Sequence, residues 1–163
     1  MSRTTVRAGV VKWLSGTDGL SKVYASTPKF DPGEAYIPNP GAPSGAVAVV
    51  YLGAERENRE AYGGWKRVHY DVTLDLYHRS IEGDADDVMA SFDALVENVK
   101  VRLRADGDHT WGGLFWTAAE TSVSDPNGPI DIVVAYGEPI LSSGVTLTWA
   151  GVGFPIYEQV QVG

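Results

Sequence analysis

The sequence predicts an α+β fold in which a mainly antiparallel β-sheet packs against one long α-helix, with a short helix added at the N-terminus. Two observations lead to this prediction. Apolar and polar side chains alternate along residues 68–77, which is the period of a strand with one buried face. Apolar side chains then recur every three or four positions along residues 84–104, which is the period of an amphipathic helix. The predicted order of helix, strands, long helix and strands fits an α+β fold better than a regularly alternating α/β fold.

Length and composition favour one globular domain. The chain has 163 residues, of which 44% are hydrophobic and 21% are charged, so we expect residues 1–163 to form a single domain. No apolar run is long enough to predict a membrane span, and residues 1–7 lack the layout of a signal peptide. The absence of cysteine excludes disulfides and cysteine metal sites. A net charge of −8 argues against a general nucleic-acid clamp, because binding phosphates requires clustered Lys and Arg.

The first part of the chain predicts a short helix and a long loop. Residues 4–14 fit an amphipathic helix, because four apolar residues share one stripe: Val6, Val10, Val11 and Leu14. Glycines end this helix, and residues 20–24 fit a short extended piece. Residues 27–45 are rich in proline and glycine, and proline removes backbone donors and fixes φ. We therefore expect an extended loop on the surface, within one domain, over residues 27–45.

A strand and a charged loop are expected next. Residues 46–52 are a compact apolar run that predicts an inner strand. Residues 53–64 carry charges of both signs and exceed the length of a tight hairpin turn, so we expect a loop that projects from the sheet. Such a loop is either a solvated tip or an arm that contacts a partner.

The central strand and the long helix have the clearest patterns. One face of the strand is apolar, with Val68, Tyr70, Val72, Leu74 and Leu76, and the other carries His69, Asp71, Thr73, Asp75 and Tyr77. Asp84 is the expected helix N-cap, and Asp86 and Asp87 place negative charge where the helix dipole favours it. The predicted buried stripe of the helix is Val88, Phe92, Leu95, Val96, Val99 and Leu103.

The last third of the chain predicts short strands separated by turns. Residues 111–116 form a turn rich in glycine and aromatic residues, leading into a strand that fades near Val123. Residues 125–129 predict a strong turn, with further strands at 130–136 and 145–149. The tail, residues 151–163, fits either an edge strand or a loose C-terminal arm.

The sequence carries few signs of catalytic or metal-binding chemistry. His69 shares a strand face with Asp71 and Asp75, and one histidine with two carboxylates can hold a metal. The strand spaces these positions widely, so a solvated sheet face is the simpler interpretation. His78 and His109 are expected at the surface. No nucleophile elbow or phosphate-binding glycine motif occurs, so we predict no enzyme, no catalytic residue, no metal and no cofactor.

Aromatic residues are abundant, and aromatic side chains favour cores and interfaces. The chain has five tryptophans and eight tyrosines. Most are expected in the core. Trp65, beside the charged loop, and Trp111, among glycines, are the two tryptophans for which we expect partial exposure.

Several segments together resemble a known family. They are the helix ending in Trp13-Leu14, residues 19–24 (GLSKVY) leading to Pro28-Lys29, residues 44–50 (SGAVAVV), the charged loop closing on Gly63-Gly64-Trp65-Lys66, the strand reaching Leu76-Tyr77, residues 91–96 (SFDALV), and the strand from Val145 to Trp149. In order and length the chain resembles tail terminator proteins of long-tailed bacteriophages, especially those of the actinobacterial phage type. The resemblance covers nearly the full chain and rests on architecture and general pattern.

The resemblance implies a structural virion protein that forms a ring, usually a hexamer, at the head-proximal end of the tail. Such a ring caps the tail tube, ends its polymerisation and joins it to the neck. The implied partners are other copies of the chain, the tail tube protein and the head–tail connector or neck protein. DNA would be only passing cargo in the channel, and no membrane would take part. The protein would be made in the host cytoplasm and end in the virion.

The family offers no catalytic residue to transfer, and its interfaces carry no motif. From the sequence we predict contacts to a neighbouring subunit or to the tube through the 53–65 stretch and the proline-rich segment: Glu55, Arg56, Glu57, Arg59, Glu60, Trp65, Phe30 and Tyr36. Three alternatives stay open. These are a head–tail connector or neck protein, a non-viral small-molecule binding module with an apolar pocket lined by Trp111 and Trp116, and an enzyme that uses His69 with Asp71.

Overall fold

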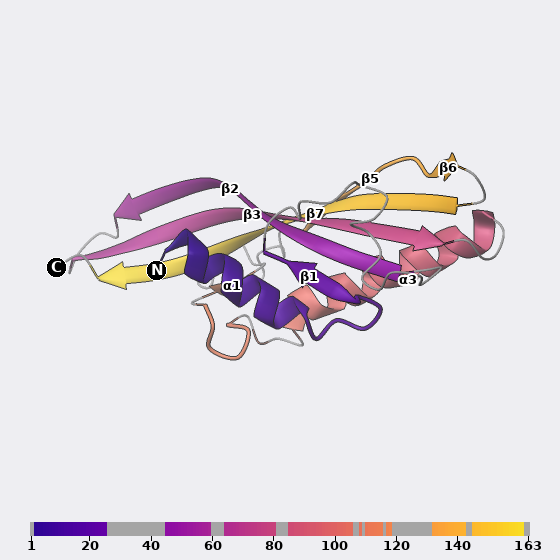
Figure 1. Ribbon diagram of the computed structural model, residues 1–163. Coiled ribbons are helices and arrows are strands. Elements are labelled where there is room, and N and C mark those ends of the chain that lie inside the picture. Colours follow the sequence, from indigo (N-terminus) through magenta and orange to yellow (C-terminus); the bar gives the residue numbers. More distant parts are fainter. Residues whose placement is uncertain are drawn as a thin grey trace.

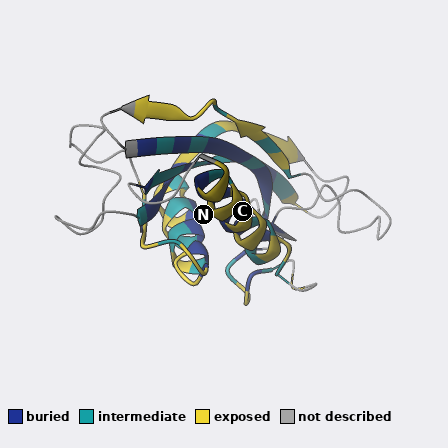
Figure 2. Cartoon of the chain, turned by 90° about the vertical axis from the view of Figure 1, so that its right-hand side faces the viewer, coloured by how far each residue is buried: buried dark blue, intermediate teal, exposed yellow. Residues whose placement is uncertain are grey.

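The computed structural model describes residues 2–25, 45–59, 64–80, 85–105, 108, 110–115, 117–118, 132–142 and 145–161 (Figure 1). Within these residues, one sheet of seven strands curves over two helices (Figure 2). The α+β prediction is therefore confirmed. The prediction of a single packing helix is wrong, because α1 (Arg3–Leu14) and α3 (Ala85–Arg104) both cover the same face of the sheet.

Three long antiparallel strands form the centre of the sheet: β2 (Gly45–Arg59), β3 (Trp65–Ser80) and β7 (Val145–Gln161). On the far side of β2, the short strand β1 (Lys22–Tyr24) pairs in parallel, which makes the sheet mixed. On the far side of β7, three short antiparallel strands follow one another: β6 (Ile140–Ser142), β5 (Val133–Tyr136) and β4 (Thr117–Ala118).

The core lies between the sheet and the two helices, as the sequence periods predict. The apolar face of β3 is buried, with Val68, Tyr70, Val72, Leu74 and Leu76. The predicted stripe of α3 is also buried, with Val88, Phe92, Leu95, Val96, Val99 and Leu103. In α1, Val6, Val10 and Leu14 are fully buried, whereas Val11 is only partly buried. Burying a side chain of this kind contributes about 2 kcal/mol to stability.

The predicted loop at residues 53–64 is wrong for the part of it that the structure describes. β2 continues through this stretch to Arg59 and pairs with β3 as far as the partners Arg59 and Lys66. On this part of β2 the charged side chains remain exposed to water, so the main chain can pair with β3 without burying a charge. Residues 60–63 lie outside the described residues.

The tail at residues 151–163 was predicted as either an edge strand or a loose C-terminal arm, and up to Gln161 it is a strand, so the arm is wrong there. These residues form the second half of β7, which pairs with β3 from Ser80 and Thr146 at one end to Trp65 and Gln161 at the other. β4 and β5 pair with the opposite side of this half, so it is an inner strand. The strand predicted at 130–136 is confirmed from Val133 to Tyr136.

Several predicted features lie outside the described residues. They are the loop at 27–44, the helix cap at Asp84, the turn at 125–129, the strand beyond Ala118, and the side chains of His109 and Trp116.

Candidate functional site

The sheet ends in a tip that reaches past the N-terminal end of α1 (Figure 1). We define the sheet tip as residues 55–59 of β2, 65–70 of β3 and 156–161 of β7, which pair side by side. Three of the predicted contact residues with described side chains, Glu55, Arg56 and Glu57, are exposed on β2 of the tip, and Trp65 starts β3 with 38% of its surface exposed.

The remaining predicted contact residues are not placed by the structure. Arg59 ends β2, but only its main chain is described. Glu60, Phe30 and Tyr36 lie outside the described residues. The sheet tip therefore brings together Glu55, Arg56, Glu57 and Trp65.

A β-bulge sets which way the charges of the tip point. The register of β2 against β3 shifts between Leu52 and Glu55. Beyond the shift, Glu55 pairs with Tyr70 and Glu57 with Val68, so both carboxylates belong to the face that the helices cover farther along the sheet. Arg56, paired with His69, belongs to the opposite face. The bulge therefore decides that Glu55 and Glu57 share the face of Tyr70 and Val68, while Arg56 lies on the opposite face.

Arg3, at the start of α1, fixes the bulge. Its Nη2 donates to the main-chain oxygens of Leu52, at 2.7 Å, and Gly53, at 3.3 Å, and its Nη1 lies 3.9 Å from a carboxylate oxygen of Glu55. On the tip itself, Nζ of Lys66 lies 2.9 Å from Oε1 of Glu57. Exposed ion pairs of this kind are each worth less than about 1 kcal/mol, so they orient the side chains more than they stabilise the fold.

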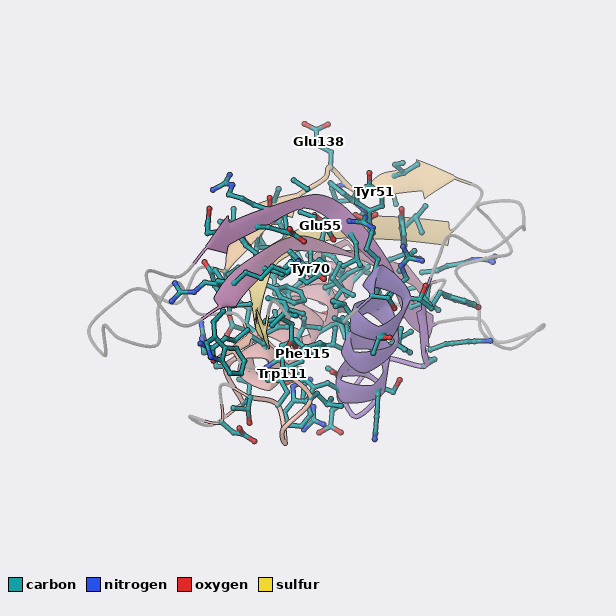
Figure 3. All side chains as sticks on the ribbon, turned by 90° about the vertical axis from the view of Figure 1, so that its left-hand side faces the viewer. Tyr51, Glu55, Tyr70, Trp111, Phe115 and Glu138 are labelled. Carbon is teal, nitrogen blue, oxygen red and sulfur yellow. The ribbon has the colours of Figure 1, made fainter. Side chains whose placement is uncertain are left out.

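Tyr70 lies at the base of the sheet tip and is almost fully buried. Burial raises the pKa of its phenol, and the carboxylates of Glu55, Glu158 and Glu57 raise it further. The hydroxyl therefore stays protonated and can donate a hydrogen bond. Figure 3 shows Tyr70 beneath the strand that carries Glu55.

The pair formed by His69 and Asp71 exists, but among the described residues no third side chain of metal-binding type joins it. Nε2 of His69 lies 2.9 Å from Oδ1 of Asp71, and the imidazole stacks on Tyr157 with ring centroids 4.8 Å apart. Within the described ranges, no group of three or more His, Cys, Asp or Glu residues is placed to hold a metal ion. His78, predicted at the surface, is half-buried against Phe92, and burial lowers the pKa of its imidazole.

Trp111, expected to be partly exposed, is fully buried. Its indole stacks on Trp13 with ring centroids 5.8 Å apart, meets Phe115 and Phe154 edge-on or tilted, and donates from Nε1 to the main-chain oxygen of Leu103. Trp111 therefore fills the core and does not line a ligand pocket (Figure 3).

The structure also contains a cleft that the sequence did not predict. It has a volume of about 310 Å³ and lies between the C-terminal ends of the two helices, with Trp13 and Asp18 on one side and Asn98, Val101 and Arg102 on the other. We call this the helix cleft. Trp13 and Arg102 are 89 positions apart in the chain, so no local pattern indicates that they meet.

A second unpredicted feature is an exposed apolar edge. Val133, Tyr136, Ile140 and Leu141 are all more than half exposed, and all belong to β5 or β6 at the border of the sheet. We call residues 133–142 the edge segment. The apolar pair Ile140-Leu141, placed between Pro139 and Ser142-Ser143-Gly144, is the sequence signal that could have indicated it.

No protein-family model and no curated protein matches the chain. Among the described residues, no helix is both long enough and apolar enough to cross a membrane.

Proposed function

We propose that the chain is a structural protein that assembles into a ring and closes the end of a phage tail tube, as a tail terminator. The family in this proposal comes from the resemblance to tail terminator proteins in the order and length of the sequence segments described above. The observation that carries the proposal is the sheet tip, a three-stranded projection that exposes Glu55, Arg56, Glu57 and Trp65 to solvent. A projection of this kind suits contact with a second large surface better than the capture of a small ligand.

Two further observations support a binding role over an enzymatic one. In the described residues, the titratable side chains with shifted pKa values are Tyr70, Asp75 and His78, at separate positions along β3, and Glu97 on α3, and none of them lines the helix cleft or the second cleft beside Asp71. Perturbed groups that converge in a pocket are the usual sign of a catalytic site. The exposed apolar edge segment, by contrast, is the kind of surface that proteins use to bind one another.

A head–tail connector or neck protein is the alternative within the same class. Both proteins would form rings from small α+β subunits, and both would bury one exposed patch of a copy against a different patch of the next. The two differ in the partner, which is the tube for a terminator and the portal side of the joint for a connector.

The deciding measurement is the absolute mass in solution, by light scattering behind a size-exclusion column over a range of concentrations. One chain has a mass of 17.5 kDa. We expect one discrete species with the mass of a closed ring, a hexamer in the family that the chain resembles. A protein that remains monomeric up to millimolar concentration would contradict self-assembly into a ring. Electron microscopy of the ring with purified tail tubes then separates a terminator from a connector.

A further inference from the structure

The edge segment carries one negative charge in an apolar surround. Val133, Tyr136, Ile140 and Leu141 are 64%, 53%, 61% and 71% exposed, so water covers most of each apolar side chain. Glu138, between β5 and β6, is exposed, and its carboxylate points away from the body of the protein (Figure 3). No described residue forms an ion pair or hydrogen bond with the Glu138 carboxylate.

The main chain of this segment is poorly suited to pairing with another strand. Pro139 has no N–H to donate, and the N–H of Gly137 already donates to the main-chain oxygen of Trp149 at 2.9 Å. The border is therefore interrupted at the point where Glu138 projects. A partner that binds here must do so through side chains.

The helix cleft, on the other side of the molecule, has the complementary chemistry. The Arg102 guanidinium lies 3.8 Å above the ring of Trp13, and its Nε donates to the main-chain oxygen of Trp13. Its terminal nitrogens make no hydrogen bond or ion pair with the described residues, and a Cβ added to Gly16 would lie 2.9 Å from Nη2. Beside the guanidinium, Val101 is 52% exposed. The cleft thus offers a planar cation with free donors next to apolar surface.

The carboxylate of Asp18 disfavours the binding of another carboxylate in the helix cleft. It is the one carboxylate among the described residues that line the helix cleft, and its side chain is exposed. A carboxylate that enters the cleft is attracted by the charge of Arg102 and repelled by the charge of Asp18. The attraction by Arg102 outweighs the repulsion by Asp18, because the guanidinium is held in a fixed, stacked position and its planar donors bind a carboxylate through two parallel hydrogen bonds.

We propose that Glu138 of one copy, with the apolar residues around it, docks into the helix cleft of the next copy and binds Arg102. This inference rests on the proposed ring. A ring closes through contacts between two different patches of the same protein, and the two patches are distinct: the edge segment borders the sheet beside β7, whereas the helix cleft lies between the C-terminal ends of α1 and α3. Charge complementarity, exposed apolar residues on both patches and a cleft large enough for a side chain all favour a second copy as the occupant.

Cysteine trapping tests the contact directly, because the chain has no cysteine of its own. The variants Glu138→Cys and Val101→Cys, mixed and mildly oxidised, are expected to form a disulfide-linked dimer that neither forms alone. Glu138→Cys mixed with Ser91→Cys is the matched control, since Ser91 is an exposed residue of α3 outside the cleft.

Two substitutions measure the energetics of the same contact. Glu138→Ala should weaken self-association about tenfold, the usual effect of losing a hydrogen-bonded charge partner. Asp93→Ala, which removes an exposed carboxylate from α3, should leave it unchanged. Asp18→Asn should strengthen self-association, because it removes the opposing charge.

The outcomes separate this inference from the proposed ring. A ring by mass with no cross-link between positions 138 and 101, or with an equal cross-link to position 91, overturns the docking and leaves the ring. A cross-link between 138 and 101 without any closed ring supports the docking and contradicts the ring. A monomer at every concentration with no cross-link overturns both.

Discussion

Trp13 and Arg102 hydrogen-bond each other twice. Nε1 of Trp13 donates to the main-chain oxygen of Arg102, and Nε of Arg102 donates to the main-chain oxygen of Trp13, each at 2.9 Å. The guanidinium also lies over the indole ring. This reciprocal arrangement joins the C-terminal ends of α1 and α3, and it gives the two helices one fixed relative position on the sheet.

The first prediction concerns this link. Arg102→Ala removes a cation–π contact and a hydrogen bond from a half-buried position, so the free energy of unfolding should fall by about 2 kcal/mol. Arg102→Lys keeps the charge but loses the planar donor, and it should recover less than half of that loss. Urea unfolding followed by circular dichroism measures both. Equal stability of wild type and Arg102→Ala would show that the link does not hold the helices.

The second prediction concerns the close approach of Gly137 and Trp149. A Cβ added at Gly137 would lie 2.8 Å from Cε3 of Trp149, so Gly137→Ala must displace the indole and should cost about 1–3 kcal/mol. Gly53→Ala is the control, because its Cβ would meet nothing closer than 3.6 Å. Thermal unfolding gives the stability, and tryptophan fluorescence reports the movement of the ring. A Gly137→Ala protein as stable as Gly53→Ala would contradict this packing.

The third prediction is a pH dependence at Asp75. Burial raises the pKa of this carboxyl, and the hydrogen bond from Trp149 opposes the increase. Because the folded pKa lies above the unfolded value of 3.8, the charged form destabilises the fold at neutral pH. The destabilisation caused by Asp75 therefore decreases as the pH falls from above its pKa in the folded state towards its pKa in the unfolded state.

Asp75→Asn should therefore be more stable than wild type at pH 7, since the amide oxygen still accepts from Trp149. The difference between the two proteins should shrink as the pH falls towards 3.8. Asp93→Asn, at an exposed position of α3, makes the same change in net charge and should show no such trend. Melting temperatures measured from pH 4 to 7 test this, and parallel curves for wild type and Asp75→Asn would count against it.

The fourth prediction concerns the sheet tip, and it depends on the proposed function. Arg56→Glu combined with Trp65→Ala alters exposed side chains, so the fold and the ring mass should be unchanged while binding to tail tubes falls at least tenfold. Lys12→Glu, on the exposed side of α1, is the control for charge. Co-sedimentation with tubes measures binding. If the double variant bound tubes as well as the wild type does, the sheet tip would not be part of the contact surface.

The sequence predicts best where one element carries its own period. The alternation of β3 around Val72 and the stripe of α3 around Val96 both fix a buried face without knowledge of the partner, and the structure confirms both. It predicts poorly where pairing overrides local character. Glu55 and Glu57 look like loop residues, yet the main chain of β3 supplies hydrogen bonds that no local pattern shows.

The tryptophans show the same limit for the candidate site. Trp111 sits next to glycines, which suggests exposure, but its burial depends on Trp13, which belongs to α1 and lies far away in the chain. The helix cleft arises from the same long-range meeting, so it could not be predicted. Trp65, at the start of β3, is partly exposed, as the sequence predicts.

The pairing of β7 has a mechanical consequence. Every position of β3 from Trp65 to Ser80 has a partner on β7, and β4, β5 and β6 pair with segments of its opposite side. A pull on the sheet tip along the strand direction loads all of these main-chain hydrogen bonds together in shear, whereas a pull across the strands would open them one after another. The protein is therefore stiffest along the direction in which the tip projects, and a force applied there passes into the sheet without unzipping it.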